Sequence, residues 1–161
     1  MVVEPPSFIL PLGTNGFFPS FGRESASYVI PCGDILIILD AGSGLFRLAE
    51  PQGQTLLKQS SQIHLYLSHY HLDHTFGFYG AFNLFKDKNV TVFGMENKKV
   101  FSELPSLNYF PIDYEKEFSH FRWKKLGPGN HTEEELESQA ELARSVFPRT
   151  QIAKDLSPLE I

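Results

Sequence analysis

The chain has 161 residues, of which 42% are hydrophobic and 20% are charged, and its formal net charge is -5. This length predicts one domain over residues 1–161 and excludes two ordinary domains, and no apolar run is long enough to span a membrane. The acidic balance excludes broad attraction to DNA, although a local basic patch can still hold a phosphate, and the N-terminus lacks a secretory signal, so we expect a cytoplasmic protein.

Strands and turns are predicted for the first third of the chain. Apolar runs at 7–12 and 26–30 end at turn residues, which predicts two short strands. The run 35–39 is apolar without alternation, as expected for a strand that is buried on both faces in a sheet covered on each side. A loop follows, and 45–50 is predicted to form a short helix before Pro51 interrupts the chain.

Strands alternate with helices in the middle of the chain, which predicts an α/β fold. A strand at 63–67 leads into a histidine-rich segment, and a short helix is predicted at 76–85. The run 89–93 is rich in β-branched residues and predicts a further strand, followed by a helix at 95–104. One more strand is predicted at 118–123.

The end of the chain carries the clearest helix signal. Residues 127–130 mark a sharp break, after which Thr132 and Glu135 form a capping box. Apolar residues then recur on one helical face as far as Phe147, and a short strand is expected at 151–153. This helix is therefore predicted to pack on an apolar surface.

Three features of the sequence are interpreted as structural. The 15 phenylalanines lack regular spacing, which favours a Phe-rich core over a base-stacking platform. Cys32 is the single cysteine, so no intramolecular disulfide is expected. His64 alternates within a predicted strand and is expected to be a hydrogen-bonded core histidine rather than a ligand.

Residues 68–75 read Ser-His-Tyr-His-Leu-Asp-His-Thr and directly follow a predicted strand. Imidazoles and carboxylates are ligands of Zn and similar divalent metals, and this density disfavours a surface loop with chance histidines. His69 and His71 project to the same side of an extended segment and can share one ion. Asp73 and His74 come further round the loop and can reach a second ion. The sequence therefore predicts a site for two metals.

This segment resembles the His-x-His-x-Asp-His signature of the metallo-β-lactamase fold hydrolases. Residues 37–42 resemble the strand of that family that ends in Asp-x-Gly beside the metals. Gly13-Thr14, Gly22-Arg23 and Ser27-Tyr28 resemble the entry of its phosphodiesterase-like and ribonuclease Z-like branch. The resemblance covers about residues 8 to 120 and implies a metallo-β-lactamase-like αββα sandwich.

The same resemblance implies hydrolysis by a metal-activated water, with two divalent ions that are Zn, or else Mn or Fe. Asp73 would be the catalytic residue that binds one metal and orients the nucleophile. Asp40 would hold the ligand loop by hydrogen bonds, although a turn aspartate is the alternative. Gly42 and Gly44 would let backbone pass close to the metals. Arg23 would steady a substrate phosphate, unless it is an ordinary surface arginine.

The resemblance covers the first αβ half of this domain and its last helix and strand, but no segment resembles the rest of the second half. Residues 8–126 resemble the N-terminal αβ half, and 130–161 resemble the last helix and strand, so a shortened fold is expected. Two catalytic metals need about three protein ligands each, and the loop offers four. His131, Asp113 and Asp155 are candidates for a further ligand, as is a second copy of the chain.

Three functions remain open. The first is hydrolysis of a phosphodiester, either a cyclic nucleotide or RNA. The second is hydrolysis of a thioester or lactone by the same loop, because substrate choice lies outside the motif. The third is a non-catalytic remnant that acts as an interaction module. A shortened domain would also expose an apolar sheet face, so a homo-oligomer is expected.

Overall fold

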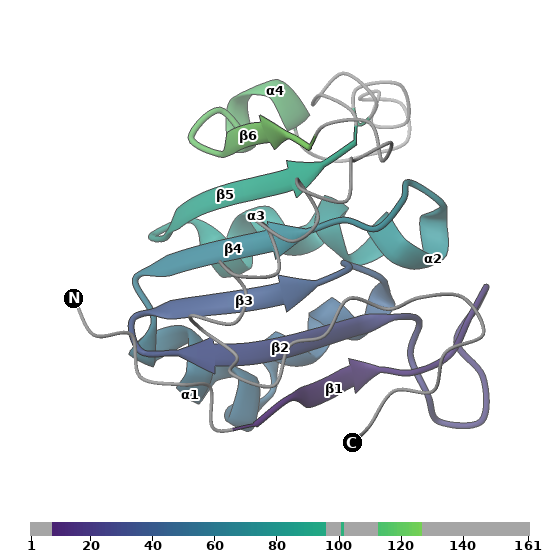
Figure 1. The fold of residues 1–161 in the computed structure, drawn as a ribbon. Coiled ribbons are helices and arrows are strands. Elements are labelled where there is room, and N and C mark those ends of the chain that lie inside the picture. The colour runs from purple at the N-terminus through teal and green to yellow at the C-terminus, as the bar shows by residue number, and fades with distance from the viewer. Residues whose placement is uncertain (1–7, 96–100, 102–112, 127–161) are drawn as a thin grey trace, which may run out of the picture.

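The computed structural model describes residues 8–95, 101 and 113–126 of the chain, which is shown in Figure 1. Six strands form one sheet in the order in which they occur in the sequence. The first three strands are antiparallel neighbours, and the third to the sixth run parallel. The strands are β1 (Leu10–Gly13), β2 (Ser27–Cys32), β3 (Ile35–Leu39), β4 (Gln62–Tyr66), β5 (Asn89–Gly94) and β6 (Arg122–Lys125).

Short helices fill the connections, and α1 and α3 lie behind the sheet in Figure 1. None of the helices within the described ranges is both long and apolar enough to cross a membrane. The parallel strands joined by helical connections confirm the predicted α/β fold. The helices are η1 (Ser43–Ala49), α1 (Pro51–Gln59), α2 (Leu72–Thr75), η2 (Phe76–Gly80), α3 (Ala81–Phe85) and α4 (Tyr114–Glu117).

The strand predicted at 118–123 is wrong in its placement. The chain turns after α4, and β6 begins only at Arg122. Phe118 and Phe121 are nevertheless 3% and 5% exposed, so the apolar pattern there reports burial and not an extended strand. Because they are three positions apart, both rings point into the core from a turn. The four predicted strands that correspond to β2, β3, β4 and β5 agree with the structure within two residues at each end.

The prediction that Pro51 interrupts the chain is also wrong, because Pro51 begins the nine-residue helix α1. Proline lacks a backbone N–H, but the first N–H groups of a helix have no partner within it, so proline is favoured there. Gly53 is buried, and a Cβ at this position would collide with the backbone of Leu48. Both residues are therefore suited to a helix that packs closely on η1.

The other predicted helices divide into two groups. The helix predicted at 45–50 corresponds to the 3-10 helix η1, and the one predicted at 76–85 corresponds to η2 followed by α3. The helices predicted at 95–104 and near 132–147, and the last strand, lie outside the described residues apart from Met95 and Phe101.

The core lies between the sheet and its helices. Val29, Ile38, Leu65 and Val92 are direct neighbours across four strands and are each fully buried. Burying one such side chain contributes about 1.5–3 kcal/mol, so this row is a main source of stability. Aromatic rings extend the core and confirm that many phenylalanines are structural; the buried ones are Phe78, Phe85, Phe101, Phe118 and Phe121.

The expectation that β3 is buried on both faces is not met. Burial alternates along β3, with Leu36 and Ile38 at 0% exposed while Leu39 on the other face is 38% exposed. On that face Tyr66 stacks on Phe93 with ring centroids 4.4 Å apart, and both are partly exposed. An apolar run without alternation predicted two covered faces, but the helices described here cover only one.

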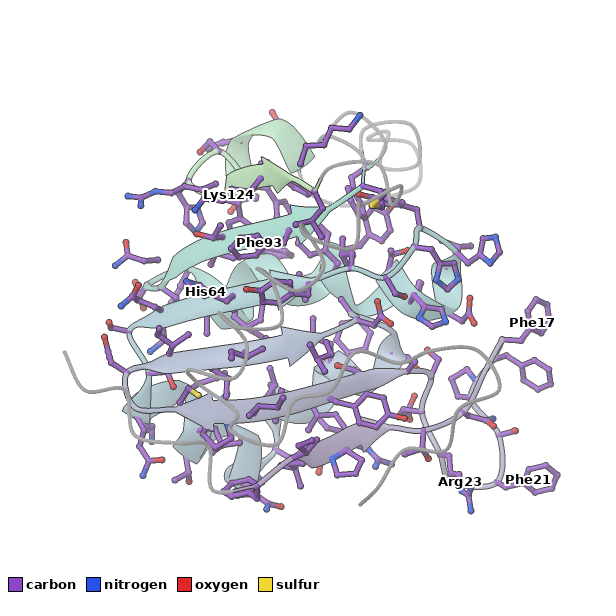
Figure 2. The ribbon with its side chains drawn as sticks, in the orientation of Figure 1. Phe17, Phe21, Arg23, His64, Phe93 and Lys124 are labelled. Atoms are coloured by element: carbon purple, nitrogen blue, oxygen red, sulfur yellow. The ribbon has the colours of Figure 1, made fainter. Side chains whose placement is uncertain are left out.

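His64 lies on this second face and is not the hydrogen-bonded core residue that was expected. Its ring meets Phe93 edge-on at 5.5 Å, and no described residue shares a hydrogen bond with it. Burial and the neighbouring charge of Lys124 lower the pKa of His64 below its ordinary value of 6.5 (Figure 2). The folded chain therefore binds a proton at His64 less readily than the unfolded chain does.

This depressed pKa predicts a pH-dependent loss of stability. Below about pH 6.5 the unfolded chain takes up a proton that the folded chain rejects, so the free energy of unfolding falls as pH falls toward the folded pKa. His64→Gln is expected to remove this part of the pH dependence. Urea unfolding of both proteins between about pH 5 and about pH 8 measures it, and parallel profiles would contradict the assignment.

Candidate metal centre

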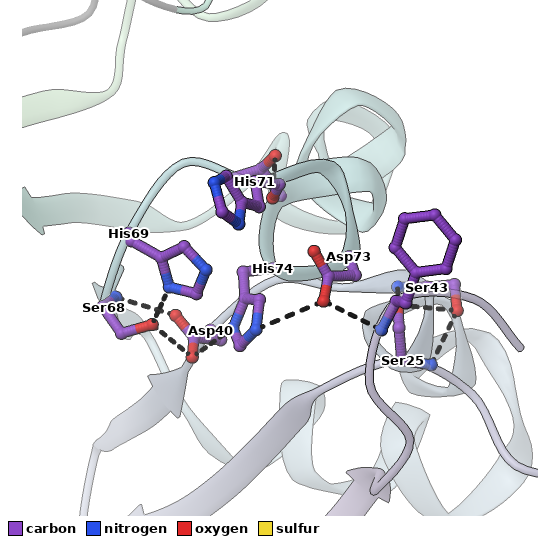
Figure 3. Close-up of polar contacts among 10 residues, drawn as sticks. Ser25, Asp40, Ser43, Ser68, His69, His71, Asp73 and His74 are labelled. Atoms are coloured by element: carbon purple, nitrogen blue, oxygen red, sulfur yellow. Dashed lines mark hydrogen bonds and ion pairs between the residues drawn. The ribbon is translucent and has the colours of Figure 1, made fainter.

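The histidine-rich segment lies where β3 and β4 end. These strands are parallel, so their carboxyl ends meet at the same edge of the sheet. Asp40 directly follows β3, and residues 68–71 connect β4 to the short helix α2. Side chains from two separate parts of the sequence are thereby brought to one place (Figure 3).

Three of the four predicted metal ligands form one compact group. One ligand atom each from His69, His71 and Asp73 lies within 4.8 Å of the other two. Zn lies about 2.0–2.2 Å from nitrogen and oxygen ligands, so two ligands of one ion are at most about 4.4 Å apart, and small side-chain movements would bring this group to that spacing. The donor set of two imidazoles and a carboxylate therefore fits a divalent metal.

His74 is next to this group and lies between Asp40 and Asp73 (Figure 3). Its ring centroid is 4.0 Å from that of His69, and its Nε2 atom is 3.5 Å from Oδ2 of Asp73. Its Nδ1 atom is 2.8 Å from the carboxylate of Asp40. The structure thus brings all four predicted ligands together, with His74 directly beside the group of three.

Asp40 makes the hydrogen bonds that were expected of a residue supporting the ligand loop. Its carboxylate accepts hydrogen bonds from the backbone N–H and the hydroxyl of Ser68, each at 2.8 Å, in addition to the contact with His74. The Ser68 hydroxyl donates to Asp40, so its oxygen accepts from Nδ1 of His69 at 3.0 Å. Nε2 is then the nitrogen of both rings that is available to bind a metal.

The carboxylate of Asp73 is held by a distant part of the chain. The backbone N–H of Phe17 donates a hydrogen bond of 3.0 Å to Oδ2 of Asp73. Burial opposes the charge, but this N–H, the N–H of Asp73 itself and the imidazoles of His74 and His69 together hold the pKa of Asp73 below its ordinary value. Asp73 is therefore ionised at neutral pH, as a metal ligand must be.

Gly42 lets the backbone after β3 approach the ligand loop, as the resemblance implied. A Cβ at this position would collide with the backbone oxygen of Asp73 and lie 2.6 Å from the hydroxyl of Ser25. Gly44 has a different role from the one expected, because its neighbours are Gly13 and Ser25 and not the ligand loop. The segment after β3 therefore packs on both the ligand loop and the β1–β2 connection.

Gly42→Ala is expected to destabilise the fold by about 1–3 kcal/mol, the usual cost of inserting an atom into a well-packed region. The backbone at Gly42 has φ -64° and ψ -174°, which alanine also adopts, so the effect would come from collision alone. Gly16→Ala is the matched control, because nothing lies within 4 Å of a Cβ there. Chemical unfolding measures both variants, and equal stability would contradict the close approach.

Sequence reasoning missed a buried group of hydroxyls at the base of the β1–β2 connection. The backbone N–H of Ser43 donates to the Ser25 hydroxyl at 2.8 Å, and that of Ser25 donates to the Ser43 hydroxyl at 3.0 Å. The Ser43 hydroxyl also donates to Glu24 at 2.6 Å. Ser25 and Ser43 are 18 positions apart, so no local pattern could have indicated their pairing.

Other predicted site residues lie elsewhere. The carboxylate of Asp113 accepts a hydrogen bond from the backbone of Lys116 at the start of α4, so Asp113 caps a helix and is not part of the metal group. Arg23 is exposed in the β1–β2 connection and does not belong to the group either. His131 and Asp155 lie outside the described residues.

Comparisons with known proteins agree with this fold, although no protein-family model matches the chain. Human tRNase Z, short form, superposes with a TM-score of 0.53 at 20% identity, over 76% of this chain and 46% of that one. The metallo-β-lactamase fold protein YhfI from Bacillus subtilis gives 0.48 at 20% identity, over 74% and 45%. The described residues, which form one sheet with its helices, therefore match part of the metallo-β-lactamase fold.

The sequence is similar to a particular enzyme of that fold. Ribonuclease Z from Methanosarcina mazei is 28% identical over 130 residues, which are 78% of this chain and 40% of that protein. The chain therefore resembles ribonuclease Z, as the sequence indicated, and spans less than half of the length of these relatives.

Proposed function

We propose that the chain is a metal-dependent hydrolase that uses an activated water on a phosphodiester, with RNA as the favoured substrate. The observation that carries this proposal is the convergence of His69, His71 and Asp73 on one point beside His74. The likeness to ribonuclease Z supports the choice of RNA. Because less than half of that enzyme is matched, its activity comes to this chain only as part of the proposal.

The residues of the chain have distinct roles in this mechanism. Divalent ions bound here, Zn or else Mn or Fe, would supply a water of lowered pKa and neutralise charge on the phosphoryl oxygens. His69, His71 and Asp73 would hold one ion, and His74 would contribute to a second position together with Asp73. Asp73 would also orient the nucleophile, because its carboxylate is within reach of both positions and lies 3.5 Å from His74 Nε2. Asp40 fixes the direction of the His74 ring.

The test combines metal content with turnover. The protein is purified without chelator, its metal per chain is measured, and hydrolysis of bis(p-nitrophenyl) phosphate and of a short RNA is followed in Mn or Zn buffer. Two metals per chain and turnover of both substrates are expected. One metal or none, without turnover, would indicate the non-catalytic interaction module instead, and turnover confined to a thioester or lactone would indicate the other hydrolase class.

A homo-oligomer and a cytoplasmic location are further parts of the proposal. The second sheet face leaves Leu39 38% exposed and Tyr66 and Phe93 partly exposed. A second copy that covers this face would remove apolar surface from water. Light scattering at micromolar concentration is expected to give a mass above that of one chain, and a monomer would contradict this part alone.

A further inference from the structure

Three phenylalanines of the β1–β2 connection are exposed, and the first of them contacts the metal centre. The exposed fractions are 83% for Phe17, 59% for Phe18 and 99% for Phe21. Figure 2 shows Phe17 and Phe21 pointing away from the body of the protein, on the side where α2 lies in Figure 1. These residues depart from the expectation that the phenylalanines form a core, and their exposure contributes nothing to folding.

The backbone that presents Phe17 is strained. Phe17 has φ +49°, and the N–H of Phe18 donates to the carbonyl of Gly16 at 2.6 Å, which makes Phe17 the central residue of a three-residue turn. Turns of this kind with positive φ are rare. A bulky residue in the left-handed region is an outlier, because its Cβ approaches the following carbonyl.

The backbone that presents Phe21 is strained in the same way. Ser20 and Arg23 exchange backbone hydrogen bonds of 2.9 and 3.0 Å, so Phe21 and Gly22 form a two-residue hairpin turn. Both have positive φ, +52° and +72°. Such turns favour Asn-Gly, and phenylalanine at the first position is costly. Strain at an exposed aromatic residue is an observation that calls for a functional explanation.

The loop is fixed to the metal centre and not loosely attached. The N–H of Phe17 donates to Asp73, and the side-chain amide of Asn15 donates to the carbonyl of Phe18 at 2.9 Å and to Ser20 at 2.6 Å. Phe18 contacts Phe17 edge to face with ring centroids 5.5 Å apart. The backbone that carries Phe17 is therefore held in place before any ligand arrives.

A pocket of about 480 Å³ joins Phe17 to the metal centre. Its lining combines apolar and aromatic side chains with two of the predicted metal ligands: Phe17, Tyr70, His71, Leu72 and Asp73. A ligand in this pocket can place a flat apolar group against Phe17 while its charged group lies at the metal site. A nucleotide has both a flat base and a charged phosphate. An apolar peptide offers apolar groups but no charged group for the metal site, and a membrane surface offers no flat ring.

We propose that Phe17 and this pocket stack a nucleobase of single-stranded RNA next to the phosphodiester to be cleaved, and that Phe21 stacks a neighbouring base. This inference rests on the proposed function and names the part of the substrate that the site recognises. Aromatic rings bind bases of any sequence, because every base has a π-face. The site therefore selects single-stranded RNA over duplex, whose bases are already stacked.

The first test measures binding without catalysis. A short single-stranded RNA that contains 2-aminopurine is titrated with the full chain in EDTA, and stacking is read from the fluorescence of the base. Phe17→Ala keeps the backbone N–H that holds Asp73, and it is expected to weaken binding by about fivefold to one-hundredfold. An RNA with an abasic ribose at the stacked position is expected to bind the wild type as weakly as normal RNA binds the variant.

Phe8→Ala is the matched control. Phe8 is 45% exposed and precedes β1, so it lies at the opposite edge of the sheet from the metal centre. Its removal is expected to leave the affinity unchanged. The proposal is overturned if Phe17→Ala binds RNA as tightly as Phe8→Ala does, or if the wild type does not bind the single strand.

The second test uses Phe21→Asn, for which stability and binding are expected to change in opposite directions. Asparagine tolerates positive φ, so the thermal midpoint is expected to rise, while loss of the ring weakens RNA binding by about fivefold or more. A purely structural role for Phe21 predicts no loss of affinity, and that result would overturn this part of the proposal.

Failure of this inference and failure of the proposed function give different results. If the wild type cleaves RNA and Phe17→Ala has the same KM and affinity, the hydrolase stands and the stacking site is wrong. If RNA is never cleaved but binding depends on Phe17, the stacking site stands and the hydrolase is wrong.

Discussion

His71→Ala is expected to remove bound metal and to lower the turnover of a phosphodiester by about a thousandfold or more. His71 supplies one of three ligand atoms that lie within 4.8 Å of one another, and a metal held by the two others would be bound weakly. His71 is exposed where α2 begins, so its truncation leaves no cavity and the fold should persist. Metal per chain and kcat measure the effect, and circular dichroism checks the fold.

His120→Ala is the matched control for this variant. His120 is also exposed, but it contacts Phe121 at 4.7 Å and lies outside the metal group. Metal content and turnover are expected to be those of the wild type. Full metal occupancy in His71→Ala, with the control unchanged, would show that the predicted ligands do not act together.

Asp40→Ala is expected to weaken metal binding or activity by about tenfold to one-hundredfold without removing any ligand. Asp40 receives hydrogen bonds from both polar groups of Ser68 and contacts His74 at 2.8 Å, so its loss frees the loop and the ring together. Asp40→Asn is expected to have a smaller effect, because asparagine keeps one acceptor oxygen and tolerates the φ of +57° found here. Competition with a chromophoric chelator measures the metal affinity.

Asp34→Asn is the control at the other end of β3. Asp34 is exposed, and it accepts hydrogen bonds from the backbone and hydroxyl of Ser61, far along the strand from the metal centre. Its substitution is expected to leave metal affinity unchanged. Equal losses in the Asp34 and Asp40 variants would mean that the effect arises from general destabilisation and not from support of the ligand loop.

Segments of the fold differ in how well local sequence predicted them. The strands β3, β4 and β5 were predicted because each is a short apolar run between turn residues. The helix α1 was missed because Pro51 has opposite meanings at the first position of a helix and in its interior. Which of the two positions Pro51 takes depends on where the preceding turn ends, and single-residue preferences do not specify that. The error at 118–123 arose because burial and strand geometry leave the same apolar signature.

The candidate site shows the same division between local and long-range information. His69, His71, Asp73 and His74 were predicted because they lie within six positions of one another, so the motif itself brings them together. The hydrogen bonds of Asp40 were expected from the resemblance, but their geometry required β3 and β4 to end side by side. The contact between Phe17 and Asp73 spans 56 positions and had no signal in the sequence.

The sequence by itself predicted the kind of chemistry, because candidate ligands for divalent metals lie within one short segment, and it determined the α/β class through the alternation of apolar runs. Only the tertiary structure decided which residues support and surround the ligands. Sheet pairing and loop packing join segments that are distant in the chain, and these contacts placed the exposed aromatic loop at the mouth of the site. They also left one face of the sheet without a cover among the described helices.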